Sequence, residues 1–163
     1  MFFCLHTSAQ KNVTQVSQSV LTGIVLPQGS KQDKRFLIVL TAKTLLDIES
    51  KKVNARIKIT EVFYLPSATV SGFNADSLVN QFTILGWNII PVETDNKYVW
   101  LQKDNRSIIA YFLMNEKQTE VYFGETETPP NLVAGITNYT LMIQLLIQNE
   151  SASGCNTLIN HCL

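Results

Sequence analysis

The chain has 163 residues, of which 45% are hydrophobic and 16% charged, and its 13 basic and 13 acidic side chains leave no formal net charge. This composition excludes a wholly disordered chain, and the length suits one domain with a buried core. The lack of a basic bias argues against nucleic acid as a partner.

The first ten residues, MFFCLHTSAQ, resemble the end of a secretory signal with a cleavage site after Ala9. Their apolar run is shorter than the ~7–15 residues of a working signal, and no Lys or Arg precedes it. We expect a secreted or periplasmic protein, with a cytoplasmic protein as the alternative. The chain divides into a signal-like start and flexible lead-in (1–19), an α+β domain (20–128), and an apolar C-terminal segment with a loose tail (129–163).

A strand and a helix are the first predicted elements. Residues 20–26 (VLTGIVL) are apolar and β-rich, and the turn residues that follow them end this strand. Ser30 and Asp33 stand three apart before an apolar run, as in a capping box, which predicts a helix over residues 33–50. We expect its buried stripe to consist of Leu37, Leu40, Thr44 and Ile48.

Residues 55–65 carry the clearest strand pattern, because Ile57, Ile59 and Phe63 alternate with polar residues. Glu61 falls on the same apolar face as these three. A carboxylate in that place indicates an edge position, a bulge or a functional group.

A second helix is predicted over residues 74–85, and four antiparallel strands follow it. Asn74 is a suitable N-cap, and Gly86 stands where a left-handed residue commonly ends a helix. The buried stripe of this helix consists of Leu78, Phe82 and Leu85. The strands of the meander are predicted at residues 88–93, 98–102, 107–114 and 119–124.

The turn spacing of this meander predicts its register. One face carries a lateral row in which each residue pairs with the next, made of Glu93, Tyr98, Tyr111 and Tyr122, with Trp100 opposite Ile109 on the same side. The other face is the aliphatic core face on which both helices are expected to pack, and it holds Ile90, Val92, Val99, Leu101, Ile108, Ala110, Phe112, Val121 and Phe123. A slip of one residue would expose these aliphatic side chains, which is disfavoured.

The aromatic row supplies the candidate binding residues, because Tyr and Trp combine a large apolar body with a polar tip. They are Tyr98, Trp100, Tyr111, Tyr122 and Glu93. Three interpretations stay open. The row is a structural sheet face held by cross-strand pairs, or it is covered by residues 131–148 or a second subunit, or it recognises a protein, peptide or glycan.

Residues 131–148 are apolar and contain no charged side chain. Ile136, Tyr139, Ile143 and Leu146 recur in them at helical spacing. The segment is too short, and too interrupted by polar residues, for the ~20 apolar residues of a membrane span. We expect it to pack on the domain.

No known catalytic arrangement stands in the sequence. Both histidines, His6 and His161, and the three cysteines, Cys4, Cys155 and Cys162, lie near the chain ends. Nucleophile-elbow, P-loop and dinucleotide-binding motifs are absent. We predict no cofactor and no metal site, and we favour a protein that is not an enzyme.

The order of elements predicts an α+β fold, with two helices packed on one face of a mainly antiparallel sheet that ends in a four-stranded meander. The favoured function is a non-catalytic, exported binding module that uses the aromatic sheet face for a protein, peptide or glycan. The same face is also a candidate surface for pairing two copies of the chain. The alternatives are a small enzyme with a pocket between helices and sheet at Glu61, and a membrane-tethered structural protein.

Overall fold

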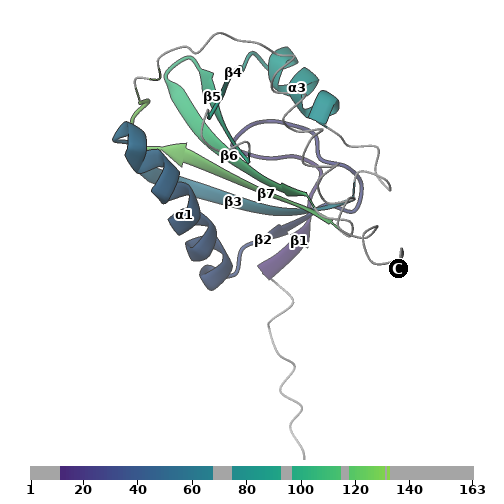
Figure 1. The fold of residues 1–163 in the computed structure, drawn as a ribbon. Coiled ribbons are helices and arrows are strands. Elements are labelled where there is room, and N and C mark those ends of the chain that lie inside the picture. The colour runs from purple at the N-terminus through teal and green to yellow at the C-terminus, as the bar shows by residue number, and fades with distance from the viewer. Residues whose placement is uncertain (1–11, 68–74, 93–96, 115–117, 131, 133–163) are drawn as a thin grey trace, which may run out of the picture.

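A seven-stranded antiparallel sheet runs through the computed structural model, which describes residues 12–67, 75–92, 97–114, 118–130 and 132. The strands lie in the order β1-β2-β3-β7-β6-β5-β4, so the C-terminal strand β7 pairs with β3 in the middle of the sheet (Figure 1). Their bounds are Val13–Gln15 (β1), Lys31–Asp33 (β2), Ile57–Pro66 (β3), Asn88–Pro91 (β4), Tyr98–Lys103 (β5), Arg106–Met114 (β6) and Gln118–Thr126 (β7).

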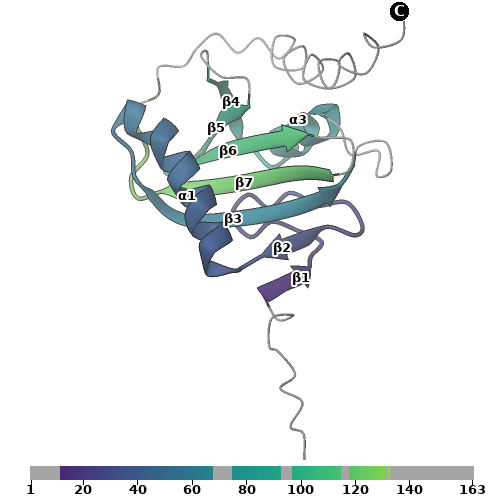
Figure 2. The same ribbon diagram turned by 60° about the horizontal axis from the view of Figure 1, so that its bottom comes forward.

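Within the described residues, two α-helices pack against this sheet. Helix α1 spans Phe36–Ser50 and runs into a short 3₁₀ turn, η2, at Lys51–Val53, while helix α3 spans Ala75–Ile84. The predicted class is confirmed: an α+β fold with two helices on a mainly antiparallel sheet that contains a strand meander. Their placement differs in one respect from the prediction, because α1 lies over one face of the sheet and α3 over the other (Figures 1 and 2).

The α3 face holds the larger hydrophobic core. The predicted aliphatic positions of the last three strands lie there, and Phe123 at their centre makes edge-on ring contacts with Phe63, Phe82 and Phe112. Leu78 and Phe82 of α3 are buried as the periodicity predicted. Two residues after the helix comes Gly86, whose φ of 79° is left-handed, with backbone bonds from Gly86 N to Thr83 O and from Trp87 N to Phe82 O.

Strand β4 is shifted by one residue from its predicted register. The predicted pairing of Glu93 with Tyr98 places Ile90 opposite Leu101, whereas Ile90 pairs with Trp100 in the structure. Since side chains alternate between faces, Ile90 and Val92 lie on the α1 face, and Ile89 takes the place on the α3 face. Glu93 itself lies outside the described residues.

The amino-terminal part of the domain also differs from the prediction. Residues 13–15, expected in a flexible lead-in, form the edge strand β1. Residues 18–26 make a loop with one isolated bridge, from Gln18 to Val25, in place of a strand. This 18–26 loop shares the α3 face with the helix, and its buried Leu21, Ile24 and Leu26 complete the core there.

The side chains of Gln81 on α3, Trp87 in the connection to β4 and Arg106 on β6 hold the 18–26 loop in place. Trp87 Nε1 donates to the carbonyl of Thr22 at 2.8 Å. The side chain of Gln81 bonds both backbone groups of Val25, at 2.7 and 3.1 Å. Arg106 donates to the carbonyl of Leu21, and its guanidinium carbon lies 5.5 Å from the centre of the Trp87 ring. The Thr22 carbonyl is buried and requires such a partner, which Trp87 supplies.

Candidate functional site

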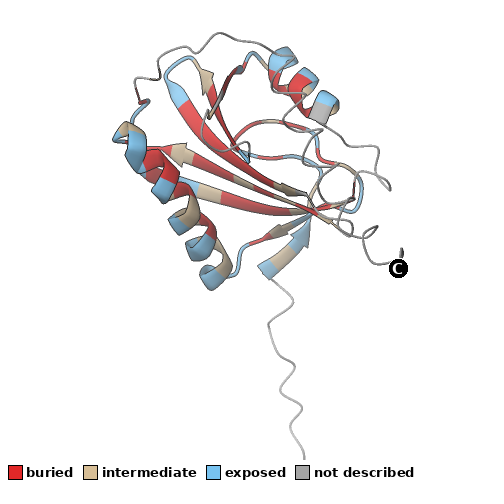
Figure 3. Cartoon of the chain, in the orientation of Figure 1, coloured by how far each residue is buried: buried red, intermediate tan, exposed pale blue. Residues whose placement is uncertain are grey.

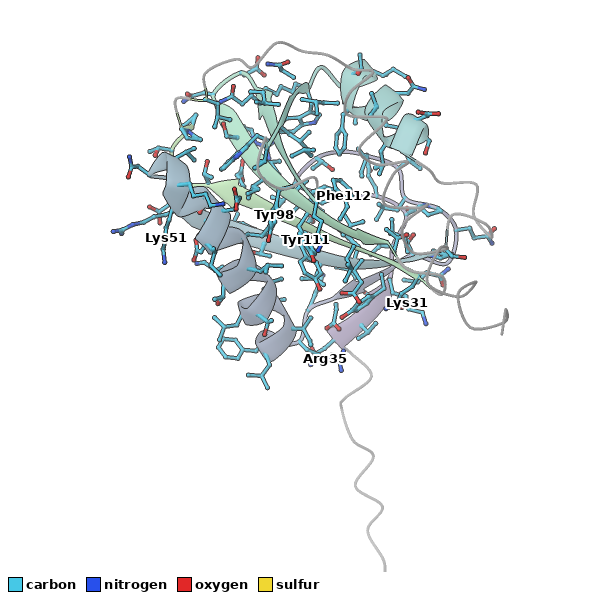
Figure 4. The ribbon with its side chains drawn as sticks, viewed as in Figure 1. Lys31, Arg35, Lys51, Tyr98, Tyr111 and Phe112 are labelled. Carbon is cyan, nitrogen blue, oxygen red and sulfur yellow. The ribbon has the colours of Figure 1, made fainter. Side chains whose placement is uncertain are left out.

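The predicted aromatic row forms across the sheet. Tyr98 pairs with Tyr111 and Tyr111 with Tyr122, while Trp100 lies opposite Ile109, as the turn spacing indicated. The ring centres are 4.9 Å apart for Tyr98 and Tyr111, and 5.3 Å apart for Tyr111 and Tyr122. Figure 4 shows Tyr98 and Tyr111 next to each other on the sheet beside α1. The Tyr111 and Tyr122 rings are stacked and the Tyr98 ring is tilted against Tyr111, so the three tyrosines form a continuous cross-strand ladder.

This ladder is mostly buried. Tyr98 is 7% exposed, Trp100 3% and Tyr111 9%, while Tyr122 is partly buried. They form one hydrophobic cluster with Leu46 of α1. Burial of this extent leaves the rings of Tyr98 and Trp100 no broad face for a ligand, so the candidate site moves from the row as a whole to its edge against α1.

A hollow lies along that edge, between α1 and the sheet. Its lining comes from two places, the outer side of α1 and the last two tyrosines of the ladder, and consists of Leu40, Thr41, Thr44, Leu45, Ile48, Tyr111 and Tyr122. We call it the α1 groove. Its volume is about 440 Å³, and no charged residue lines it. A groove of this composition accepts apolar groups.

Helix α1 turns its predicted buried stripe toward the groove and the solvent. Leu37 is 71% exposed, Leu40 45% and Ile48 60%, whereas the residues that α1 buries are Ala42, Leu46, Glu49 and Ser50. Figure 3 shows the buried positions gathered in the half of α1 that leads to η2. The prediction of which side is covered was wrong, because the helix begins with five apolar residues that point in all directions. Phe36, 74% exposed, extends the bare apolar surface beyond the groove.

A glycine on β7 sets the position of α1. A Cβ built on Gly124 would lie 2.9 Å from Leu46 Cδ1 and 3.1 Å from Ile57 Cδ1, so the two side chains occupy the space that its missing side chain leaves. Leu46 is fully buried in this contact. The close approach brings the C-terminal half of α1 down onto the sheet, and the helix is anchored there.

A bulge in β3 completes the α1 face. The register between β3 and β7 shifts between Ile57 and Ile59. Ile57 therefore joins the α1 face, although alternation alone would place it with Ile59. Glu61 stays on the α3 face opposite Phe123, and it shares that face with Phe63 as predicted.

The carboxylate of Glu61 is hydrogen-bonded to the 18–26 loop. The residue is 6% exposed, and its carboxylate accepts hydrogen bonds from Ser19 Oγ at 2.6 Å, Val20 N at 3.1 Å and Leu21 N at 3.2 Å. Three donors, two of them backbone groups, explain why a charge is tolerated among apolar neighbours. These contacts account for the position of Glu61 by a structural role.

Polar groups lie next to the aromatic ladder at the end where β7 pairs with β3. Tyr122 donates its hydroxyl proton to Glu120 Oε2 at 2.5 Å. Burial, and then this hydrogen bond, raises the pKa of Tyr122 far above its usual value. Burial likewise raises the pKa of Tyr64, the residue opposite Glu120 on β3. Tyr122 therefore acts as the hydrogen-bond donor to Glu120 at this end of the ladder.

A short ion pair stands before the start of α1. Arg35 donates to both carboxylate oxygens of the buried Asp33, with Nη2 2.6 Å from Oδ2, and its backbone N–H donates to Oδ1 at 2.9 Å. These bonds lower the pKa of Asp33. The capping box predicted from Ser30 and Asp33 does not form, since Asp33 belongs to strand β2 and the N-cap position, Arg35, makes no side-chain cap.

Comparison with known protein families, with curated proteins and with solved structures finds no match for this chain. Within the described ranges, His, Cys, Asp and Glu side chains do not gather in groups of three that suit a metal ion. None of the described helices has the length and apolarity to cross a membrane.

Sequence reasoning named the two tyrosines of the groove but missed its other wall. The available signal was the run Phe36–Leu40 (FLIVL), which is apolar on all sides. A helix of that kind contacts apolar neighbours on more than one side. Applied to α1, this rule points to a second contact surface beyond the one on the sheet.

Proposed function

We propose that the protein is a non-catalytic binding module whose α1 groove holds an apolar segment of a partner protein. The observation that carries this proposal is the exposure of Leu37, Leu40 and Ile48, which the helical periodicity marks as a contact face. Exposed apolar patches that continue over several turns of a helix are typical of interaction sites. The proposal narrows the predicted ligand classes to a protein or peptide.

The dimensions of the surface favour a peptide over a small molecule. From Leu37 to Ile48 the helix rises about 16 Å, or about three turns. The hollow underlies only part of this length, and the apolar surface continues past it to Phe36 and Leu37. An amphipathic helix lying alongside α1 would cover the whole stripe with residues at i, i+3, i+4 and i+7.

A glycan is a weaker candidate for the same site. Sugar rings stack on broad aromatic faces and hydrogen-bond to polar groups near them. In the groove the tyrosines are mostly covered, and the remaining lining is aliphatic except for Thr41 and Thr44. Leucine and isoleucine side chains instead complement aliphatic and aromatic residues of a peptide.

Selection from a displayed library of random peptides, long enough for about three helical turns, tests the proposal. Enriched peptides are then synthesised, and their dissociation constants are measured by fluorescence anisotropy against two variants. Ile48→Glu places a charge in the groove. Ile84→Glu is the matched control, since Ile84 is an exposed isoleucine, 83%, near the end of α3 on the other side of the sheet.

We expect Ile48→Glu to weaken peptide binding by at least about tenfold, which corresponds to about 1.4 kcal/mol. Ile84→Glu should bind as the unsubstituted protein does. Equal effects of the two variants, or a library that yields no peptide sensitive to Ile48→Glu, would contradict the proposal. Circular dichroism of both variants confirms that each keeps its fold.

A further inference from the structure

The described chain ends on the same face of the sheet as the α1 groove. Leu132 packs against the hydrophobic cluster that contains Leu46, Tyr111 and Tyr122. Two residues earlier, the carbonyl of Pro130 accepts a hydrogen bond from Gln102 Nε2 at 3.3 Å. These contacts place the last described residues on the α1 face of the sheet.

The residues that follow are apolar and uncharged. Residues 133–148 (VAGITNYTLMIQLLIQ) contain no Asp, Glu, Lys or Arg, and Ile136, Tyr139, Ile143 and Leu146 recur at helical spacing. A helix of this length would be about 24 Å long, which exceeds the three-turn exposed stripe of α1. A segment with such a stripe gains free energy only when the stripe is buried.

From these two surfaces we infer that residues 133–148 occupy the α1 groove in the free protein. The groove and the segment are both apolar, and Leu132 holds the start of the segment on the same face of the sheet as the groove. A tether of this kind raises the effective concentration of the segment to the millimolar range or above, which favours the intramolecular contact over a second copy. Where the α1 groove also binds partner peptides, as proposed above, the partner has to displace this segment.

A photo-crosslinking experiment on the full chain tests where the segment lies. Benzoylphenylalanine is introduced in place of Ile48, whose exposed side chain tolerates replacement, and in a second protein in place of Ile84 as the matched control. Both proteins are irradiated without any peptide, separated by size under denaturing conditions, digested, and mapped by mass spectrometry.

We expect the probe at position 48 to give an intrachain product that joins it to residues 133–148, and the probe at position 84 to give none. A product between two chains would assign the groove to a second copy and overturn the inference. A probe at position 48 that reacts only with other parts of its own chain, or only with solvent, would overturn it too.

A variant of the segment provides a second readout. Leu146→Glu places a charge in the apolar stripe, and we expect the intrachain product from position 48 to be lost. The affinity of library peptides for this variant should rise about tenfold if the segment fills the groove about 90% of the time. An unchanged affinity after loss of the crosslink would overturn the competition with partners.

The two experiments separate the inference from the proposed function. The crosslink needs no peptide, so it is found or missed whether or not the groove binds a partner. If the crosslink forms but the library yields no binding peptide, the segment is a permanent cover of the groove and the proposed function fails. A negative crosslink with groove-dependent peptides would leave an open binding site and remove the internal competitor.

Discussion

Ser19 Oγ donates a 2.6 Å hydrogen bond to Oε2 of Glu61, and this bond joins the 18–26 loop to β3 across 42 residues of sequence. The same carboxylate accepts the backbone N–H groups of Val20 and Leu21. Ser19 Oγ in turn accepts the N–H of Thr22 at 3.1 Å. Glu61 thereby organises the turn that covers one end of the larger core.

Glu61→Gln should destabilise the protein by about 1–3 kcal/mol. A neutral amide accepts weaker hydrogen bonds than a carboxylate, and its NH₂ group has to face one of the three donors. Urea unfolding monitored by circular dichroism gives the free energy. Glu127→Gln, at an exposed position, serves as the control and should change it by less than about 0.5 kcal/mol. Equal losses in the two variants would contradict the anchoring role of Glu61.

Gly124→Ala should cost about 1–3 kcal/mol, because the added Cβ meets Leu46 Cδ1 and Ile57 Cδ1 in a tightly packed contact. Leu46→Ala removes one of these neighbours and should itself cost about 2–5 kcal/mol. In the double variant the two costs should fall short of their sum by about 0.5–3 kcal/mol. Urea unfolding of the four proteins measures this coupling, and simple additivity would mean that the helix is not held at this point.

Alkaline pH should destabilise the protein partly through Tyr122. Its pKa is raised in the folded state by burial and by the bond to Glu120, so its contribution to stability is fully present below the unfolded value of about 10. That contribution is lost progressively as the pH rises above about 10, because the unfolded state ionises first. Tyr122→Phe should therefore flatten the decline of unfolding free energy above this pH. Parallel curves for the two proteins would show that Tyr122 titrates normally.

Acid should act through Asp33. The Arg35 side chain lowers the pKa of Asp33, so the stability that the carboxylate contributes is present above its unfolded pKa of about 3.9 and is lost as the pH falls through the folded value. Arg35→Met should shift this loss to higher pH and reduce stability at neutral pH. Lys34→Met, which deletes the neighbouring exposed charge, is the control and should leave the acid limb of the stability curve in place. An identical acid limb in both variants would refute the assignment to Arg35.

The meander was predictable because its turns are short and its side chains alternate. Tyr98, Tyr111 and Tyr122 fall into one row whenever the two hairpins close simply, and both do. The register of β4 was predicted wrongly, because simple closure of the turn before Tyr98 was assumed and the strand pairs one residue away from that register. A shift of one residue there moved Ile90 and Val92 to the other face.

The candidate site was predictable only in half. Tyr111 and Tyr122 were named from the alternation of the strands. The other wall of the groove comes from α1. The periodicity of α1 indicated which residues form its apolar stripe, but it did not indicate whether the sheet covers that stripe. The bond network of Glu61 was equally out of reach, because its donors lie in a loop that the sequence pattern assigned to a strand.

The amino-acid sequence by itself determined the class of the fold, the helices and strands of its second half, and the aromatic ladder, because these depend on alternation, helical spacing and turn residues that are local in the chain. The tertiary structure decided which face each helix covers. A glycine on β7 makes room for Leu46, and a bulge in β3 turns Ile57 toward it. These contacts join residues far apart in the sequence, and they place α1 on the aromatic face and leave Leu37, Leu40 and Ile48 exposed. A helix that is apolar on several sides can pack on any of them, so only the three-dimensional packing selects the side that is buried.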